Sequence, residues 1–144
     1  MIASLQAAAP TLGLQLVFAN AGTDSDLQMA FATLSRQRVD AVLLGVSTFY
    51  PRRTEQLAVL AARHALPAIF PYPEHALAGG LISYGTNYAY VSHQVGIYTG
   101  RILKGEKPAD LPVEQPTKFE LVINLRTAKT LGLTIPETLL ATAR

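Results

Sequence analysis

Aromatic, hydroxyl and carboxylate side chains follow three of the strands expected in this sequence, at the points where those strands end. The set is Ser47, Thr48, Phe49, Tyr50, Tyr72, Glu74, Ser83 and Tyr84. Aromatic rings offer apolar contact, and hydroxyl and carboxylate oxygens offer hydrogen bonds or charge. Ligands of open α/β sheets bind beyond the carboxyl ends of the strands. We therefore expect these residues to form a site for a small polar or amphipathic solute.

The tyrosines of this set have a second interpretation. Tyr50, Tyr72 and Tyr84 could complete the hydrophobic core, with only their hydroxyls reaching solvent. A binding site is favoured for the set as a whole, because three successive strand ends carry it.

The sequence patterns of covalent catalysis are missing. In residues 80–85, GLISYG, the glycine stands too far from the serine to form a nucleophile elbow. No stretch matches a phosphate-binding P-loop or a dinucleotide fingerprint. His64, His75 and His93 share no metal-ligand spacing, and the chain has no cysteine. We expect a binding protein that has no metal site, no cofactor and no catalytic residues.

Composition narrows the class of protein further. The 144 residues are 49% hydrophobic and 15% charged, which is typical of one globular domain. A net charge of +2, with Arg52-Arg53 as the only adjacent basic pair, argues against nucleic-acid binding. Residues 1–10 contain no charged side chain and so lack the basic start of a signal peptide.

Strand and helix patterns alternate along the chain. Continuous apolar runs predict strands at residues 14–19, 41–46, 68–70, 81–84 and 119–123. Helical spacing predicts helices at 2–12, after a cap formed by Thr23 and Asp26, from Pro51 to about His64, and from 88 to 105. This alternation predicts an α/β fold with a mostly parallel sheet and helices on both faces. The chain opens on a helix where such folds usually open on a strand, so we expect it to begin partway through its fold.

Four stretches in the second half of the chain resemble a known family. They are GGLISYG at 79–85, ILKGEKPADLP at 102–112, VEQPTKFELVIN at 113–124 and TAKTLGLTIP at 127–136. Together they resemble the carboxy-terminal half of ABC-transporter substrate-binding proteins, of the tryptophan- and phenylalanine-type solute receptors. The resemblance is specific because a helix stop, a proline spacer and a strand occur in one order and spacing.

The resemblance implies one lobe of a type I periplasmic-binding-protein fold, in which two α/β lobes close on a solute. Residues 1–144 would then be a partial solute-binding domain. Residues 1–86 and 119–144 would form the second lobe, and 87–118 a crossover helix and connection toward an absent first lobe. Val91, Val95, Tyr98 and Ile102 on that helix would be left exposed, which predicts that they are covered by self-association or by a missing segment.

The implied function is that of the solute-binding component of an ABC-type import system. Its partners would be a small solute, such as an amino acid or aromatic compound, and a membrane permease. The full-length parent would be periplasmic or otherwise extracytoplasmic. Two alternatives remain open from the sequence: the ligand-sensing effector domain of a transcription regulator, and a small α/β cofactor-dependent enzyme.

Overall fold

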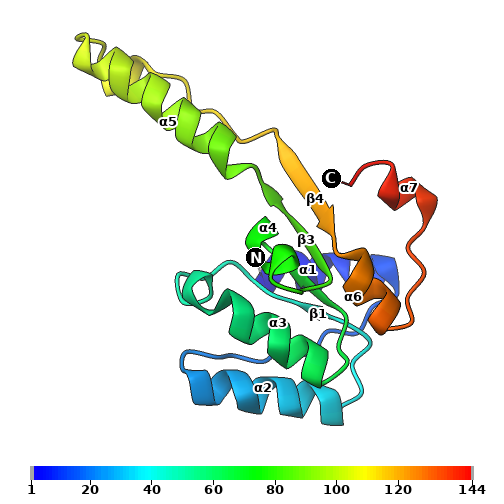
Figure 1. The fold of residues 1–144 in the computed structure, drawn as a ribbon. Helices are drawn as coiled ribbons and strands as arrows, with labels where there is room; N and C mark the ends of the chain where they lie inside the picture. The colour runs from blue at the N-terminus through cyan, green and yellow to red at the C-terminus, as the bar shows by residue number, and fades with distance from the viewer. Residues whose placement is uncertain (1, 144) are drawn as a thin grey trace.

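Four strands form the single sheet described by the computed structural model, which covers residues 2–143 (Figure 1). They are β1 (Val42–Leu43), β2 (Ala68–Phe70), β3 (Ile82–Thr86) and β4 (Phe119–Ile123), and they lie in that order. β1, β2 and β3 run parallel, whereas β4 pairs antiparallel with β3. The predicted α/β class and mostly parallel sheet are therefore confirmed.

Seven α-helices and three short 3₁₀ turns connect and cover these strands in the described part of the chain. The helices are α1 (Ile2–Ala8), α2 (Asp24–Arg36), α3 (Thr54–Arg63), α4 (Pro73–Leu77), α5 (Tyr88–Leu103), α6 (Leu125–Thr130) and α7 (Glu137–Leu140). The 3₁₀ turns are Pro10–Leu12, Pro51–Arg53 and Pro108–Asp110, each opened by proline, whose fixed φ suits a first helical position.

The hydrophobic core lies between one face of the sheet and the helices α2 and α3. Its members recur at helical spacing on the helices and at every second strand position: Leu27, Phe31, Leu34, Leu44, Leu57, Leu60, Ala61, Leu66, Ala68 and Phe70. Leu43 and Ile69 point to the opposite face, where they are 56% and 37% exposed. That second face is therefore covered less completely than the sequence predicts.

Side-chain caps fix the starts of three helices. At α2 the Asp26 amide donates to Thr23 Oγ1 at 3.1 Å, and the Thr23 amide donates to Asp26 Oδ2 at 2.9 Å. This reciprocal capping box confirms the cap predicted from the Thr23–Asp26 spacing. Asn87 and Asn124 cap α5 and α6 by accepting from the amides three residues on, at 2.7 Å and 3.0 Å.

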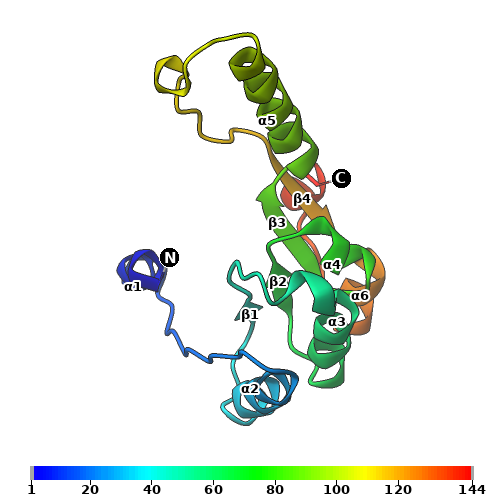
Figure 2. The same ribbon diagram turned by 90° about the vertical axis from the view of Figure 1, so that its left-hand side faces the viewer.

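Residues 14–19 do not form the strand that their apolar run predicts. This segment has no partner in the sheet and runs as an extended link between α1 and α2, apart from β1 (Figure 2). Leu14 and Phe18 are 56% and 47% exposed. No strand of the described residues lies beside the segment to take up its backbone hydrogen bonds, so the prediction was wrong for this structure. The strand predicted at 41–46 is also shorter and is reduced to β1.

Helix α5 projects away from the rest of the fold, and the chain returns along it (Figure 1). The Tyr98 hydroxyl donates to the Pro112 carbonyl at 2.8 Å, and the Gln94 amide donates to Glu114 at 3.0 Å. Arg101 forms a two-pronged ion pair with Glu106, which ties the end of the helix to the loop that follows it. Between residues 2 and 143, no helix has the length and apolar character needed to cross a bilayer.

Candidate functional site

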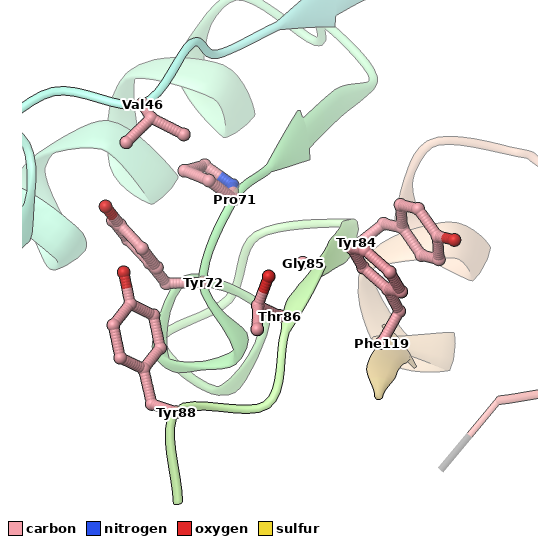
Figure 3. Close-up of a pocket in the computed structure, with 8 residues that line it drawn as sticks. All are labelled: Val46, Pro71, Tyr72, Tyr84, Gly85, Thr86, Tyr88 and Phe119. Atoms are coloured by element: carbon pink, nitrogen blue, oxygen red, sulfur yellow. The ribbon is translucent and has the colours of Figure 1, made fainter. Parts of the chain in front are cut away.

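An open pocket of about 240 Å³ lies where β2 and β3 end and β4 begins (Figure 3). Its lining combines aromatic rings with small and aliphatic groups: Val46, Pro71, Tyr72, Tyr84, Gly85, Thr86, Tyr88 and Phe119. No charged side chain belongs to this lining. The pocket therefore offers apolar contact and a few hydroxyl groups rather than an ion pair.

Two aromatic pairs flank the pocket. The Tyr72 and Tyr88 rings lie 5.4 Å apart at an angle of 57°, and Figure 3 shows their hydroxyls directed the same way. The Tyr84 and Phe119 rings are stacked, 5.7 Å apart and inclined by only 17°. Both distances fall within the range in which aromatic rings attract one another. The pairs thus hold one another in place and leave ring faces and edges open to a ligand.

The Tyr72 hydroxyl remains protonated at any physiological pH. A hydrogen-bonding interaction with the Tyr88 hydroxyl, followed by burial and by nearby charge on Glu74, raises the pKa of Tyr72 to about 12. A neutral phenol can both donate and accept a hydrogen bond. This tyrosine pair can therefore meet either a donor or an acceptor on a solute.

The antiparallel strand β4 explains how Phe119 reaches the pocket. Phe119 pairs with Thr86, the last residue of β3, because β4 runs in the opposite direction. The amino end of β4 consequently lies at the same edge of the sheet as the carboxyl end of β3. The expectation that ligands bind beyond the carboxyl ends of strands therefore does not find Phe119.

Gly85 lets the chain leaving β2 approach β3 closely at the pocket wall. A Cβ atom at this position would lie 2.1 Å from the Pro71 carbonyl oxygen, a backbone atom that cannot move aside easily. Because glycine has no side chain, Pro71 can lie close to β3 at this position. This close contact shapes the space between Tyr72 and Tyr84.

The structure brings Tyr72 and Tyr84 together at this pocket, as the sequence predicts. Ser47, Phe49 and Tyr50 lie outside its lining. Ser47 Oγ accepts a hydrogen bond from the Phe49 amide at 3.1 Å, which closes a local turn. The Phe49 and Tyr50 rings pack against the core, and the Arg53 guanidinium lies 3.7 Å from the Phe49 ring centre.

The remaining predicted residues also lie outside the lining. Thr48 and Glu74 are exposed, and Glu74 acts on the pocket only through its charge near Tyr72. Ser83 is 1% exposed and points away from Tyr84, because alternate strand residues face opposite sides of the sheet. The strand that brings Tyr84 to the pocket therefore directs Ser83 into the interior.

Several residues that line the pocket were absent from the predicted set. These are Val46, Pro71, Gly85, Thr86, Tyr88 and Phe119. Tyr88 follows β3 by two residues at the start of α5, so a search one turn beyond each strand end would have found it. Within residues 2–143, no cluster of three histidine, aspartate or glutamate side chains is suited to hold a metal ion.

A family model described as ABC transporter substrate binding protein matches residues 1–144. The chain belongs to this family. A comparison with curated proteins gives no significant match. The family assignment confirms the resemblance seen in the sequence.

Solved structures agree with this assignment. A conserved domain protein from Vibrio cholerae is 29% identical, with a TM-score of 0.88 over 99% of this chain and 48% of its own. An ABC domain from Streptococcus pneumonia, solved in complex with L-Trp, is 24% identical with a TM-score of 0.86, covering 99% and 49%. A ligand-free, open substrate-binding protein with adhesive properties from Clostridium difficile is 20% identical, with a TM-score of 0.64, covering 94% and 45%.

This member of the substrate-binding family spans about half the length of the solved structures that it matches. Almost all of its residues superpose on those structures, so its own fold corresponds to about half of theirs. The fold of a periplasmic-binding-protein domain is thereby established for the chain.

Proposed function

We propose that this chain forms one wall of a solute-binding site in an ABC-type import system. The observation that carries the proposal is the arrangement of two aromatic pairs, Tyr72–Tyr88 and Tyr84–Phe119, around one open pocket. The first lobe would supply the opposite wall and close over the solute, with no covalent chemistry.

The exposure of the rings supports a two-walled site. Tyr84, Tyr88 and Phe119 are 56%, 53% and 53% exposed, which is high for large apolar groups that lie together. The pocket of about 240 Å³ is also smaller than the roughly 300–1,000 Å³ of complete small-molecule sites. Closure by the first lobe would bury these rings against the solute and complete the volume of the site.

The chemistry of the lining favours an amino acid or other small compound with an aromatic or apolar side chain. Ring faces on this wall would contact that side chain, and the Tyr72, Tyr88 and Thr86 hydroxyls would meet its polar groups. The L-Trp bound by the Streptococcus pneumonia structure supports this class of solute. Charged groups of an amino acid would find their partners on the opposite wall, because this lining carries no charge.

The proposed cycle ends with transfer of the solute to a membrane permease, outside the cytoplasm. Genes for a permease and an ATPase beside the gene for this chain would support transport. A fused or neighbouring DNA-binding domain would instead favour a regulator.

Titration of the 144-residue chain with L-tryptophan, followed by NMR of its tyrosine and phenylalanine rings, tests the proposal. We expect saturable shifts of the Tyr72, Tyr84, Tyr88 and Phe119 signals. Replacement of Tyr84 by alanine should weaken binding about three- to tenfold, the equivalent of one lost aromatic contact. Tyr90→Ala is the matched control, since Tyr90 lies on α5 outside this pocket. Equal effects of both substitutions, or no ring shifts with any amino acid, would contradict the proposal.

A further inference from the structure

His75 is the most deeply buried titratable side chain next to the pocket, although it does not line it. It lies on α4 and is 1% exposed. Its ring stacks on Phe70 at 5.0 Å with an interplanar angle of 16°, and on Tyr72 at 5.8 Å and 26°. His75 therefore connects a core residue, Phe70, to a residue of the pocket wall, Tyr72.

The same ring also contacts the backbone of Tyr72. His75 Nδ1 lies 3.3 Å from the Tyr72 carbonyl oxygen. A carbonyl oxygen only accepts hydrogen bonds, so Nδ1 must carry the proton and donate it. In the neutral ring Nε2 is then an unprotonated acceptor, and it is buried without a hydrogen-bond partner among the described residues. A second proton on Nε2 would create a buried cation with an unmatched donor.

The surroundings of His75 favour the neutral ring. Burial is the dominant effect and lowers its pKa from the ordinary value of 6.5, opposed by the bond to Tyr72 and by Glu74. Phe70, Ser83 and Val122 form one uncharged row across β2, β3 and β4 on the side of the sheet that faces His75. Glu120 lies two residues from Val122 on the same face of β4, where it accepts a hydrogen bond from Asn87. The buried residues that α3 contributes are leucines and alanines. Of the Glu74 and Glu120 carboxylates, Glu74 is the one that raises the pKa of His75.

We propose that His75 is a positioning residue that fixes the ring and backbone of Tyr72 in the solute pocket. The proposal rests on the proposed function of that pocket. Tyr72 stands immediately before α4 in extended conformation, with φ of −129° and ψ of 139°, and its own side chain caps nothing. Stacking from His75 orients the ring of Tyr72. The Tyr72 carbonyl accepts from the His75 backbone amide at 3.2 Å, and Nδ1 adds a second hydrogen bond to it. Tyr72 in turn contacts Tyr88, so one buried imidazole orients a tyrosine pair of the site.

The first test needs no ligand and no substitution that risks the fold. The tyrosine and histidine rings are labelled with an NMR-active isotope. The NMR signals of both kinds of ring are then followed as the pH is lowered from 8. We expect the Tyr72 signals to shift with the same midpoint as His75, below 6.5. The NMR signals of Tyr84 should not shift over the pH range in which His75 titrates, because Tyr84 does not touch His75. If Tyr72 is insensitive to the titration of His75, or if both tyrosines respond equally, the proposal is overturned.

Two variants separate the stacking from the hydrogen bond. His75→Phe keeps a stacked ring and loses the donor, whereas His75→Leu loses both. We expect His75→Leu to weaken L-tryptophan binding several-fold, His75→Phe to restore part of the loss, and the pH response of Tyr72 to vanish in each. Unchanged affinity in a folded His75→Leu variant would refute the positioning role. If the wild-type chain binds no amino acid, the proposed function fails, while the Tyr72 titration still decides whether His75 positions Tyr72.

Discussion

At the scale of single residues, the pocket depends on a backbone contact as much as on its aromatic rings. Gly85 and Pro71 come so close that no side chain fits between them. Gly80 has a similar role behind the pocket, since a Cβ there would lie 2.6 Å from the Phe70 ring and 2.7 Å from the His75 carbonyl oxygen. These glycines let β2, β3 and α4 pack tightly enough for Tyr72 and Tyr84 to share one pocket.

Replacement of Gly85 by alanine should therefore damage both stability and binding. The added methyl group would push Pro71 away from β3, at a cost of about 1–3 kcal/mol for overpacking. Gly96→Ala is the control, because a Cβ at that position of α5 meets nothing within 4 Å. That change should stabilise by up to about 1 kcal/mol through helix propensity. Urea unfolding of the variants measures both effects, and equal stability of the two would rule out the close contact at Gly85.

At this scale, the sequence named two residues that the structure brings to the pocket, where the direction of the strands was inferred correctly; that they bind a solute stays a prediction. Tyr72 and Tyr84 were found because they end parallel strands. Phe119 was missed because the sequence does not reveal that β4 is antiparallel, which brings its amino end to the same edge. Ser83 was included in the predicted set because the sequence alone does not show which side of β3 faces the pocket. In the structure Ser83 lies on the other side and is buried.

At the scale of elements, local signals predicted helices better than strands. The Thr23–Asp26 spacing, Pro51 and the stop at Gly105 depend on neighbouring residues, and each marks a helix boundary within a few positions. A strand depends on a partner far away in the sequence. The apolar run at residues 14–19 has no such partner in the described chain and stays extended and exposed.

The capping box offers a direct test of the α2 boundary. Thr23→Ala removes the oxygen that accepts from the Asp26 amide and should destabilise the chain by about 1 kcal/mol. Ser25→Ala is the matched control, because Ser25 is exposed in the first turn of the same helix. Thermal unfolding should show a lower midpoint for the first variant and little change for the second. A Thr23→Ala variant as stable as the control would mean that the box does not hold the helix start.

At the scale of the whole molecule, the most unusual feature is the projecting helix α5. None of its residues is fully buried, although Val95, Ile102 and Leu103 are large apolar groups with exposures of 60%, 41% and 82%. The exposure expected for Val95 and Ile102 is thus seen in the structure. In solution such a helix face lowers its free energy by finding an apolar partner. The proposed first lobe would be that partner in the two-lobed protein.

For the isolated chain, the same face should lead to self-association. Val91, Val95, Tyr98 and Ile102 fall on one side of α5 at 100° per residue. The returning segment meets Tyr98 and leaves Val91 and Tyr98 half-buried, whereas Val95 and Ile102 stay exposed and would be buried by packing two such faces together. Sedimentation velocity should therefore show a larger species that grows with protein concentration. Val95→Glu should shift the population toward monomer, because a carboxylate in an apolar interface is costly. His93→Glu, which adds a carboxylate on the other side of the helix, should leave the association unchanged. A chain that stays monomeric at every concentration would show that α5 tolerates its exposure without a partner.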